Sequence, residues 1–178
     1  MAAMIEIHDL VKRYGKKLAL DGISMTVGEG EIVGFLGPNG AGKSTTMNIL
    51  TGYLSSTSGE VKIDGLDILD DPTEAKKRIG FLPEQPPLYT EMTVGEYLNF
   101  VYELKSCRLD RRAHLDEVMQ VTRVKDVRDR VIANLSKGYR QRIGIAQAPV
   151  RNPMIIILNK TKVGLAPKQI IEIQNLKR

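Results

Sequence analysis

Residues 31–45 read EIVGFLGPNGAGKST, an apolar run that leads directly into a glycine-rich loop. The apolar run, residues 31–36, is short and nearly free of polar side chains, which predicts a central parallel strand buried on both faces. After the loop, residues 43–54 have the pattern of a helix. A buried strand, a glycine-rich turn and a helix in this order predict an α/β fold whose core is a mainly parallel sheet.

The loop within this stretch matches the pattern G-x-x-x-x-G-K-[ST] at every fixed position. Its glycines let the backbone curl so that successive N–H groups point at phosphate oxygens, and the helix that follows directs its positive dipole end at the same anion. Lys43 is expected to reach the outer phosphates, and the hydroxyl of Ser44 to coordinate Mg²⁺. The predicted site for a nucleoside triphosphate comprises Gly37, Pro38, Asn39, Gly40, Ala41, Gly42, Lys43, Ser44 and Thr45.

The bulk composition is that of a globular protein of one domain. The 178 residues are 42% hydrophobic and 26% charged, and no apolar run approaches the roughly 20 residues of a membrane helix. One cysteine, Cys107, permits no internal disulfide, which favours a reducing compartment. The net charge of +5 is spread along the chain and aromatic residues are few, so we predict no nucleic-acid partner.

Strand patterns cover residues 4–10, 59–65, 79–82 and 154–158, with Ile5, Ile7 and Leu10 on one face of the first. Residues 28–30 suggest a turn. The run at residues 154–158 is expected to be the last strand.

Helix-start patterns dominate the middle of the chain. Asp71 with Glu74, and Thr93 with Glu96, have the spacing of a capping box. Asp110 and Ser136 are expected to cap two further helices, and residues 167–176 to form a last one. Residues of about 86–150 are thus predicted to be a helical subdomain inserted into the α/β core, with antiparallel strands at the N-terminus and residues 1–178 as a single domain.

Four stretches together resemble the nucleotide-binding domain of ABC transporters from about residue 4 onward. They are GPNGAGKST at residues 37–45, Tyr14 in KRYG, IGFLPEQ at residues 79–85, and LSKGYRQR at residues 135–142. The resemblance implies ATP and Mg²⁺ as ligands. It extends to the ATPases of ABC-2 type exporters, through LPEQ and the following PPLY.

The resemblance also implies a role for each of these stretches. Tyr14 lies where family members stack an aromatic ring on adenine. Glu84 and Gln85 lie at the loop that places a side chain near Mg²⁺ and the attacking water and that couples to the membrane partner. The signature segment, Ser136, Lys137, Gly138 and Tyr139, caps the ATP held by an opposite subunit; Lys137 and Tyr139 stand where the family has glycine and glutamine.

After the last strand the family pattern breaks. The family has Asp-Glu there, for Mg²⁺ and for the attacking water, whereas this chain has Asn159-Lys160. Asn159 keeps an oxygen ligand for Mg²⁺, but Lys160 has no acceptor and is a poor base. Ala166 replaces another expected aspartate, and neither His8 nor His114 is in a position to replace the family's switch histidine, which would follow Arg178. We therefore expect little or no hydrolysis and a C-terminally incomplete domain, as in a decaying or truncated gene.

The favoured interpretation is an ATP-binding subunit that works with an integral membrane permease and a second nucleotide-binding domain, in the cytoplasm at the inner face of the cell membrane. Three alternatives stay open: a degenerate module that binds ATP without hydrolysing it, a non-functional gene fragment, and an ABC protein acting on ribosomes or DNA. The last usually carries paired domains or long charged linkers, which are absent from this sequence.

Overall fold

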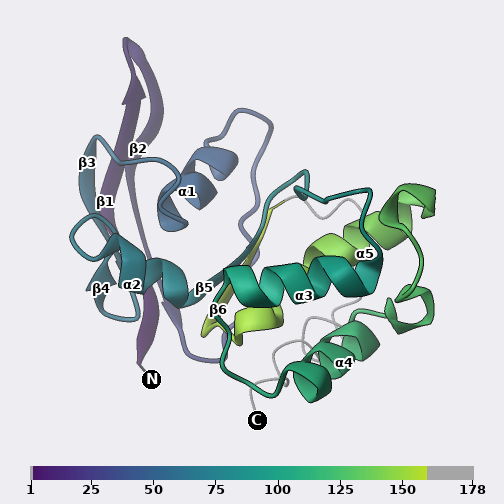
Figure 1. The fold of residues 1–178 in the computed structure, drawn as a ribbon. Coiled ribbons are helices and arrows are strands. Elements are labelled where there is room, and N and C mark those ends of the chain that lie inside the picture. The colour runs from purple at the N-terminus through teal and green to yellow at the C-terminus, as the bar shows by residue number, and fades with distance from the viewer. Residues whose placement is uncertain (1, 160–178) are drawn as a thin grey trace. The chain divides into compact units, whose positions relative to one another are not determined.

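The computed structural model describes residues 2–159 (Figure 1). The chain divides into two compact units, one up to Ile79 and one from Gly80 onward. Within the described range, no helix has both the length and the apolar character needed to span a membrane. The helix predicted at residues 167–176 lies outside the described residues.

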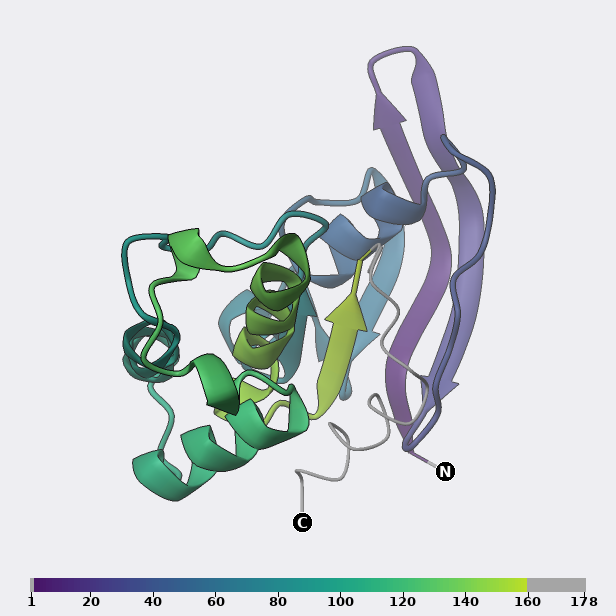
Figure 2. The same ribbon diagram turned by 90° about the vertical axis from the view of Figure 1, so that its right-hand side faces the viewer.

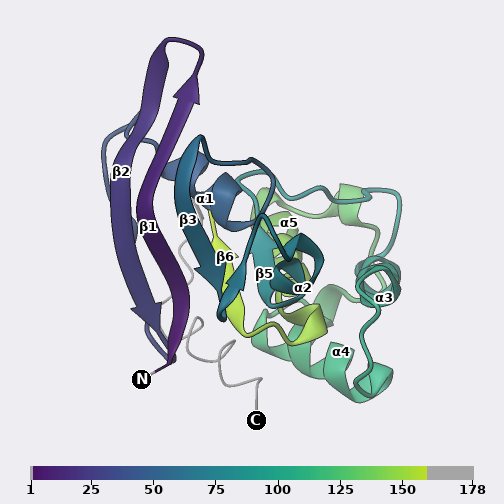
Figure 3. The same ribbon diagram turned by 90° about the vertical axis from the view of Figure 1, so that its left-hand side faces the viewer.

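The first unit is built on a four-stranded antiparallel sheet. Strand β1, Ala3–Tyr14, lies between β2, Lys17–Gly28, and β3, Ser58–Ile63, and β3 pairs with the short β4, Leu66–Asp67 (Figure 3). The antiparallel strands predicted at the N-terminus are confirmed. Strand β2 was not predicted, because its core-facing residues do not alternate regularly: of its twelve residues only Leu20 and Val27 are buried.

An irregularity in β1 explains the spacing of its apolar residues. Ile5, Ile7 and Leu10 are all buried, although a regular strand would place Leu10 on the opposite face from Ile7. The register with β2 shifts between Ile7 and Leu10, and Asp9 adopts a positive φ of 45° there. The extra residue returns the side chain of Leu10 to the core.

Two helices complete the first unit. Helix α1, Lys43–Leu50, is shorter than predicted, since a turn covers residues 51–54. Helix α2, Pro72–Lys77, has the expected proline in its first turn. The capping box predicted there is wrong: the side chain of Asp71 accepts no capping hydrogen bond, and Glu74 instead pairs with Lys77 one turn later.

The strand predicted at residues 31–36 is also wrong. These residues form neither helix nor strand, and the side chains of Ile32, Val33 and Leu36 are 55%, 50% and 92% exposed. A parallel strand is stable only where neighbours supply its hydrogen-bond ladder. No strand of the described part of the chain pairs with this run, and an apolar composition cannot provide that partner.

In the second unit, β5, Ile79–Leu82, pairs with β6, Ile155–Leu158. The N–H of Asn159, just after β6, donates to the carbonyl of Leu82, the last residue of β5, at 2.9 Å. The two strands therefore run in the same direction. Both were predicted, and together they are the parallel part of the described sheets.

Three helices lie between these strands in the sequence: α3, Val94–Leu104, α4, Arg111–Val121, and α5, Lys137–Gln147. Figure 2 views α3 nearly along its axis, beside α4 and α5. The connections include three 3₁₀ turns: η1, Lys125–Val127, η2, Ile132–Asn134, and η3, Pro149–Arg151. Pro149 begins η3 because it cannot donate the hydrogen bond that would continue α5.

All three of these helices begin at the predicted caps. Thr93 and Glu96 form a complete capping box on α3. Asp110 accepts from the N–H of Ala113 at 2.8 Å, and Ser136 accepts from the N–H of Tyr139 at 3.4 Å. The backbone N–H and the hydroxyl of Thr93 both donate to the carboxylate of Glu96, and they hold the pKa of this carboxyl below its ordinary value.

The second unit has its own apolar core. A buried hydrogen bond crosses it: the hydroxyl of Tyr97 donates to Oε1 of Gln147 at 2.7 Å, and burial raises the pKa of this phenol to about 12. The aliphatic residues that are less than 1% exposed in it are Leu82, Val94, Leu98, Val118, Val124, Ile132, Ile143, Ala146 and Val150.

Helix α3 offers a matched pair for testing this core. Leu98 is fully buried, whereas Leu104 on the same helix is 70% exposed. Replacing Leu98 with alanine is expected to lower the free energy of unfolding by about 2–5 kcal/mol, since it removes buried methyl groups and leaves a cavity. Leu104→Ala should change it by less than about 0.5 kcal/mol. Urea denaturation measures both, and equal effects would contradict the described packing.

Candidate nucleotide-binding site

The glycine-rich loop rests on strand β2 through Gly42. A Cβ atom at Gly42 would lie 2.4 Å from Cδ2 of Leu20 and 2.7 Å from the carbonyl oxygen of Ala19. Gly42 also has a φ of +83°, which side chains disfavour. Glycine is thus required there twice, once for the backbone conformation and once for the close approach to β2.

A turn precedes this contact. The N–H of Ala41 donates to the carbonyl of Pro38 at 3.2 Å, and Gly40 has a φ of +85°. Nothing lies within 4 Å of a Cβ placed on Gly40, so its requirement is conformational only. Residues 37–42 are accordingly folded back on themselves rather than extended, as the motif predicts.

Lys43 folds over the loop that precedes it. Its ammonium group donates to the carbonyl oxygen of Pro38 at 2.6 Å and also to that of Gly37. A Cβ at Gly37 would lie 3.3 Å from Cβ of Ala41 and 3.9 Å from Cδ of Lys43, so the loop encloses the lysine stem closely. The positive charge is thereby held over the residues whose amides are predicted to bind phosphate.

The first turn of α1 follows directly. Its N-cap is Gly42, which has no side chain to satisfy the first amides, and the first helical hydrogen bond runs from the N–H of Thr46 to the carbonyl of Gly42 at 2.9 Å. The amides of residues 43–45 precede that bond and have no acceptor within the helix. Together with the helix dipole, they make this end of α1 suited to an anion. Ser44 is exposed, so its hydroxyl is accessible to a ligand.

Tyr14 lies in the same unit as the loop, at the end of β1. Tyr14 is 48% exposed, and the ammonium of Lys12 lies 5.4 Å from the centroid of its ring. Lys12 is paired with Leu20, the residue that Gly42 contacts. Tyr14 is two residues further along the strand, roughly 7 Å away. The hairpin therefore brings an exposed aromatic face to the neighbourhood of the loop.

The predicted residues of the second unit gather at two places. Asn159 is tied to the end of β5, and Glu84 and Gln85, both exposed, follow that strand by two and three residues. The residues predicted as Mg²⁺ ligands within this unit thus follow the carboxyl ends of two paired parallel strands. Lys160 and Ala166 lie outside the described residues.

The other place is the start of α5. Ser136 and Lys137 are exposed, Gly138 and Tyr139 are half-buried, and a Cβ at Gly138 would meet only the hydroxyl of Ser136, at 3.8 Å. The phenol of Tyr139 donates to Oδ2 of Asp126 at 2.7 Å, which raises the pKa of Tyr139. Sequence motifs gave no signal for Asp126, because the contact joins residues of different elements.

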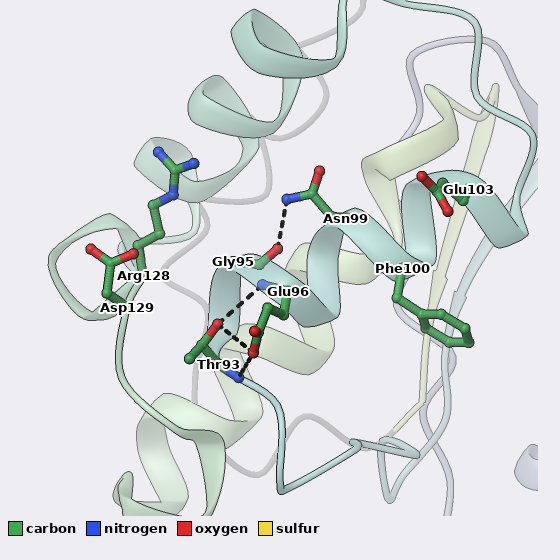
Figure 4. A pocket seen from close by; sticks show the side chains of 8 residues that line it. All are labelled: Thr93, Gly95, Glu96, Asn99, Phe100, Glu103, Arg128 and Asp129. Atoms are coloured by element: carbon green, nitrogen blue, oxygen red, sulfur yellow. Dashed lines mark hydrogen bonds between the residues drawn. The ribbon is translucent and has the colours of Figure 1, made fainter.

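A hollow of about 650 Å³ lies along α3, also unforeseen from the sequence (Figure 4). Most of the residues that line it have polar side chains, and Phe100 adds an aromatic ring. In Figure 4 the side chains of the capping box, Thr93 and Glu96, lie at the N-terminal end of α3. Arg128 and Asp129 line the hollow from the connection after η1. The lining residues are Thr93, Gly95, Glu96, Asn99, Phe100, Glu103, Arg128 and Asp129.

A glycine-rich loop that leads into a helix, with a lysine folded over the loop, is typical of P-loop nucleotide-binding proteins. The family model described as "ABC transporter" matches residues 20–161 of the chain. Because that match covers more than half of the sequence, the chain belongs to the ABC transporter family of ATP-binding proteins, in agreement with the resemblance of its motifs, and has the P-loop α/β fold of that family.

Individual relatives agree. The bacitracin transport ATP-binding protein BcrA of Bacillus licheniformis is 34% identical over 176 residues, which are 99% of this chain and 57% of BcrA. The lipopolysaccharide export system ATP-binding protein LptB of Haemophilus influenzae is 34% identical over 178 residues, 98% of this chain and 74% of LptB. This chain therefore spans little more than half the length of BcrA and about three quarters of LptB.

Solved structures give the same fold. An ATP-binding subunit of an ABC transporter superposes with a TM-score of 0.81 at 28% identity, covering 97% of this chain and 72% of that one. The cbiO1 protein of Clostridium perfringens, part of the ABC transporter complex cbiONQ, superposes with a TM-score of 0.79 at 26% identity, covering 99% and 72%.

The contact of Gly42 with β2 gives a prediction within the first unit. Gly42→Ala combines a strained φ with a clash, whereas Gly15→Ala, at φ +57° with nothing within 4 Å, has only the strain. Gly42→Ala should therefore lower the free energy of unfolding by about 1–3 kcal/mol more than Gly15→Ala does. Thermal or urea denaturation of the two variants checks this, and matching losses would mean that the loop does not pack on β2.

Proposed function

We propose that this chain binds ATP with Mg²⁺ as the nucleotide-binding subunit of an ABC transporter. The observation that carries the proposal is the loop at residues 37–45, with its two positive-φ glycines and the ammonium of Lys43 turned over it. Membership of the family supports ATP as the nucleotide. We assign Tyr14 to the adenine ring and Ser44 to Mg²⁺. Within the second unit, we assign Glu84, Gln85 and Asn159 the roles toward Mg²⁺ and the attacking water that the family resemblance implies.

The partners follow from the same membership. We propose that the chain acts with an integral membrane permease and pairs with a second nucleotide-binding domain, at the inner face of the cell membrane. Relatives named for bacitracin transport and lipopolysaccharide export, and one from the complex cbiONQ, support a partnership of this kind. The domain would comprise residues 1–178, with residues of about 86–150 as its helical subdomain.

Hydrolysis is where this chain departs from the family. Asn159 is neutral where a magnesium-supporting carboxylate is expected, and Lys160 is cationic where a base is expected. We propose that ATP binds but turns over slowly or not at all. A specific observation supports this second candidate, a binding module without turnover: the loop at residues 37–45 keeps every fixed residue of its motif, whereas the residues predicted for the water-activating step are substituted.

Binding can be tested on the purified chain. ATP–Mg²⁺ at about 100 times its dissociation constant should stabilise the fold by about 2.7 kcal/mol, which corresponds to several degrees in melting temperature. Lys43→Ala should abolish most of this shift because it removes the cation over the loop. Lys77→Ala removes a charge from an exposed ion pair in the same unit and is the matched control, with an unchanged shift. An unmodified chain that ATP–Mg²⁺ does not stabilise would support the non-functional fragment instead.

Turnover is tested by restoring the carboxylates. The double variant Asn159→Asp, Lys160→Glu is expected to release phosphate about 10²–10⁴ times faster than the unmodified chain, the usual contribution of general-base catalysis. Asn159→Asp alone returns the metal ligand but no base and is the control, with little gain. Phosphate release by the unmodified chain at the rate of the double variant would refute impaired hydrolysis.

A further inference from the structure

The start of α5 is weakly held by its own cap. Ser136 accepts from the N–H of Tyr139 at 3.4 Å, close to the upper limit for a hydrogen bond. The first turn contains no acidic residue, while Lys137 and Arg140 place positive charges near the positive end of the helix dipole. Local interactions alone therefore leave the signature segment, residues 136–139, poorly fixed.

The side chain of Tyr139 supplies an anchor outside the helix. Its hydroxyl donates to the carboxylate of Asp126 in η1 at 2.7 Å, a charge-assisted hydrogen bond. The guanidinium of Arg142 lies 5.2 Å from the ring centroid, and the half-buried ring packs against the apolar core of the second unit. Three different contacts thus fix one side chain of the signature segment.

The element that carries Asp126 is itself firmly attached to α3. The N–H of Gly95 donates to the carbonyl of Arg128 at 2.8 Å, and that of Val94 to the carbonyl of Arg130 at 3.2 Å. A Cβ at Gly95 would lie 3.1 Å from Cγ of Arg128, so this glycine allows the close approach of the two segments. Val127, which lies between Asp126 and Arg128 in the sequence, is buried. The anchor for Tyr139 is therefore a rigid one.

We propose that Tyr139 is a positioning residue, which acts through Asp126 to hold Ser136 and the amides of the signature segment in the geometry needed to contact the phosphates of an ATP bound by a second domain. The proposal rests on the proposed function, since it requires that the chain pairs with a second ATP-binding domain. Tyr139 stands where related signatures have glutamine, so the anchor belongs to this chain's own substitution. Loss of the hydroxyl should loosen the segment without touching the P-loop.

Hydrogen exchange on the full chain tests the anchor directly. Tyr139→Phe keeps the ring, its packing and its contact with Arg142 and removes only the hydroxyl. Amide exchange over residues 136–140 should rise roughly three- to tenfold, as expected for loss of a hydrogen bond to a charged group at a partly exposed site. Asp126→Ala should give the same increase, and the double variant no further one, because both changes remove the same interaction.

The matched control is Lys125→Ala, which breaks a neighbouring hydrogen bond of η1, from Lys125 to Asp116 at 2.5 Å, and should leave this exchange unchanged. Unchanged exchange in Tyr139→Phe, or an equal rise in Lys125→Ala, would overturn the anchor.

A second measurement separates positioning from a merely structural role. ATP–Mg²⁺-dependent pairing of the chain, followed by sedimentation, should weaken roughly three- to tenfold in Tyr139→Phe, while the dissociation constant for ATP at the P-loop stays the same. A fall in ATP affinity or melting temperature without a change in pairing would indicate a structural role only, and an absence of pairing in the unmodified chain would overturn the positioning role. If the proposed function is wrong, ATP binds neither to the unmodified chain nor to Tyr139→Phe. If only the anchor is wrong, both still bind ATP.

Discussion

The closeness of Gly42 to strand β2 is the constraint on which the first unit depends. Only a residue without a side chain can place its backbone against Leu20 and the carbonyl of Ala19, and only glycine adopts the left-handed conformation there without strain. Helix α1 begins at the next residue, so the same contact sets where the positive end of the helix lies. The position of the phosphate loop is thus decided by packing against an antiparallel hairpin.

In the second unit, backbone hydrogen bonds bring distant parts of the sequence together. The amide of Asn159 donates to the carbonyl of Leu82, which aligns the ends of β5 and β6 although Leu82 and Asn159 are 77 positions apart in the sequence. The segment after η1 is held by the first amides of α3, and Asp126 within η1 accepts a hydrogen bond from the phenol of Tyr139. The hydroxyl of Tyr139 therefore bonds to Asp126, a residue outside the signature segment.

The family assignment and the chemistry address different questions. The fold and the loop are those of ABC ATP-binding proteins, and the relatives at 34% identity agree. The proposed loss of turnover rests on Asn159 and Lys160, which stand where the family resemblance implies aspartate and glutamate, whereas the P-loop keeps every fixed residue of its motif. Binding and hydrolysis are separable because backbone amides and one ammonium group can bind a triphosphate. Hydrolysis needs in addition a general base that activates the attacking water.

The sequence by itself determined the local features of this protein. Side-chain caps act within three or four residues, so Thr93, Asp110 and Ser136 could be recognised as helix starts, and the spacing of glycines with Lys43 predicted the folded loop. Only the tertiary structure decided what depends on a partner. Residues 31–36 have the composition of a buried strand, yet no described strand supplies their hydrogen bonds. Leu10 reached the core through a bulge, and the hydroxyl of Tyr139 met Asp126 because the connection after α4 brought it there. Strand ladders and side-chain contacts between elements require two segments to meet, and no periodicity within one segment specifies the other.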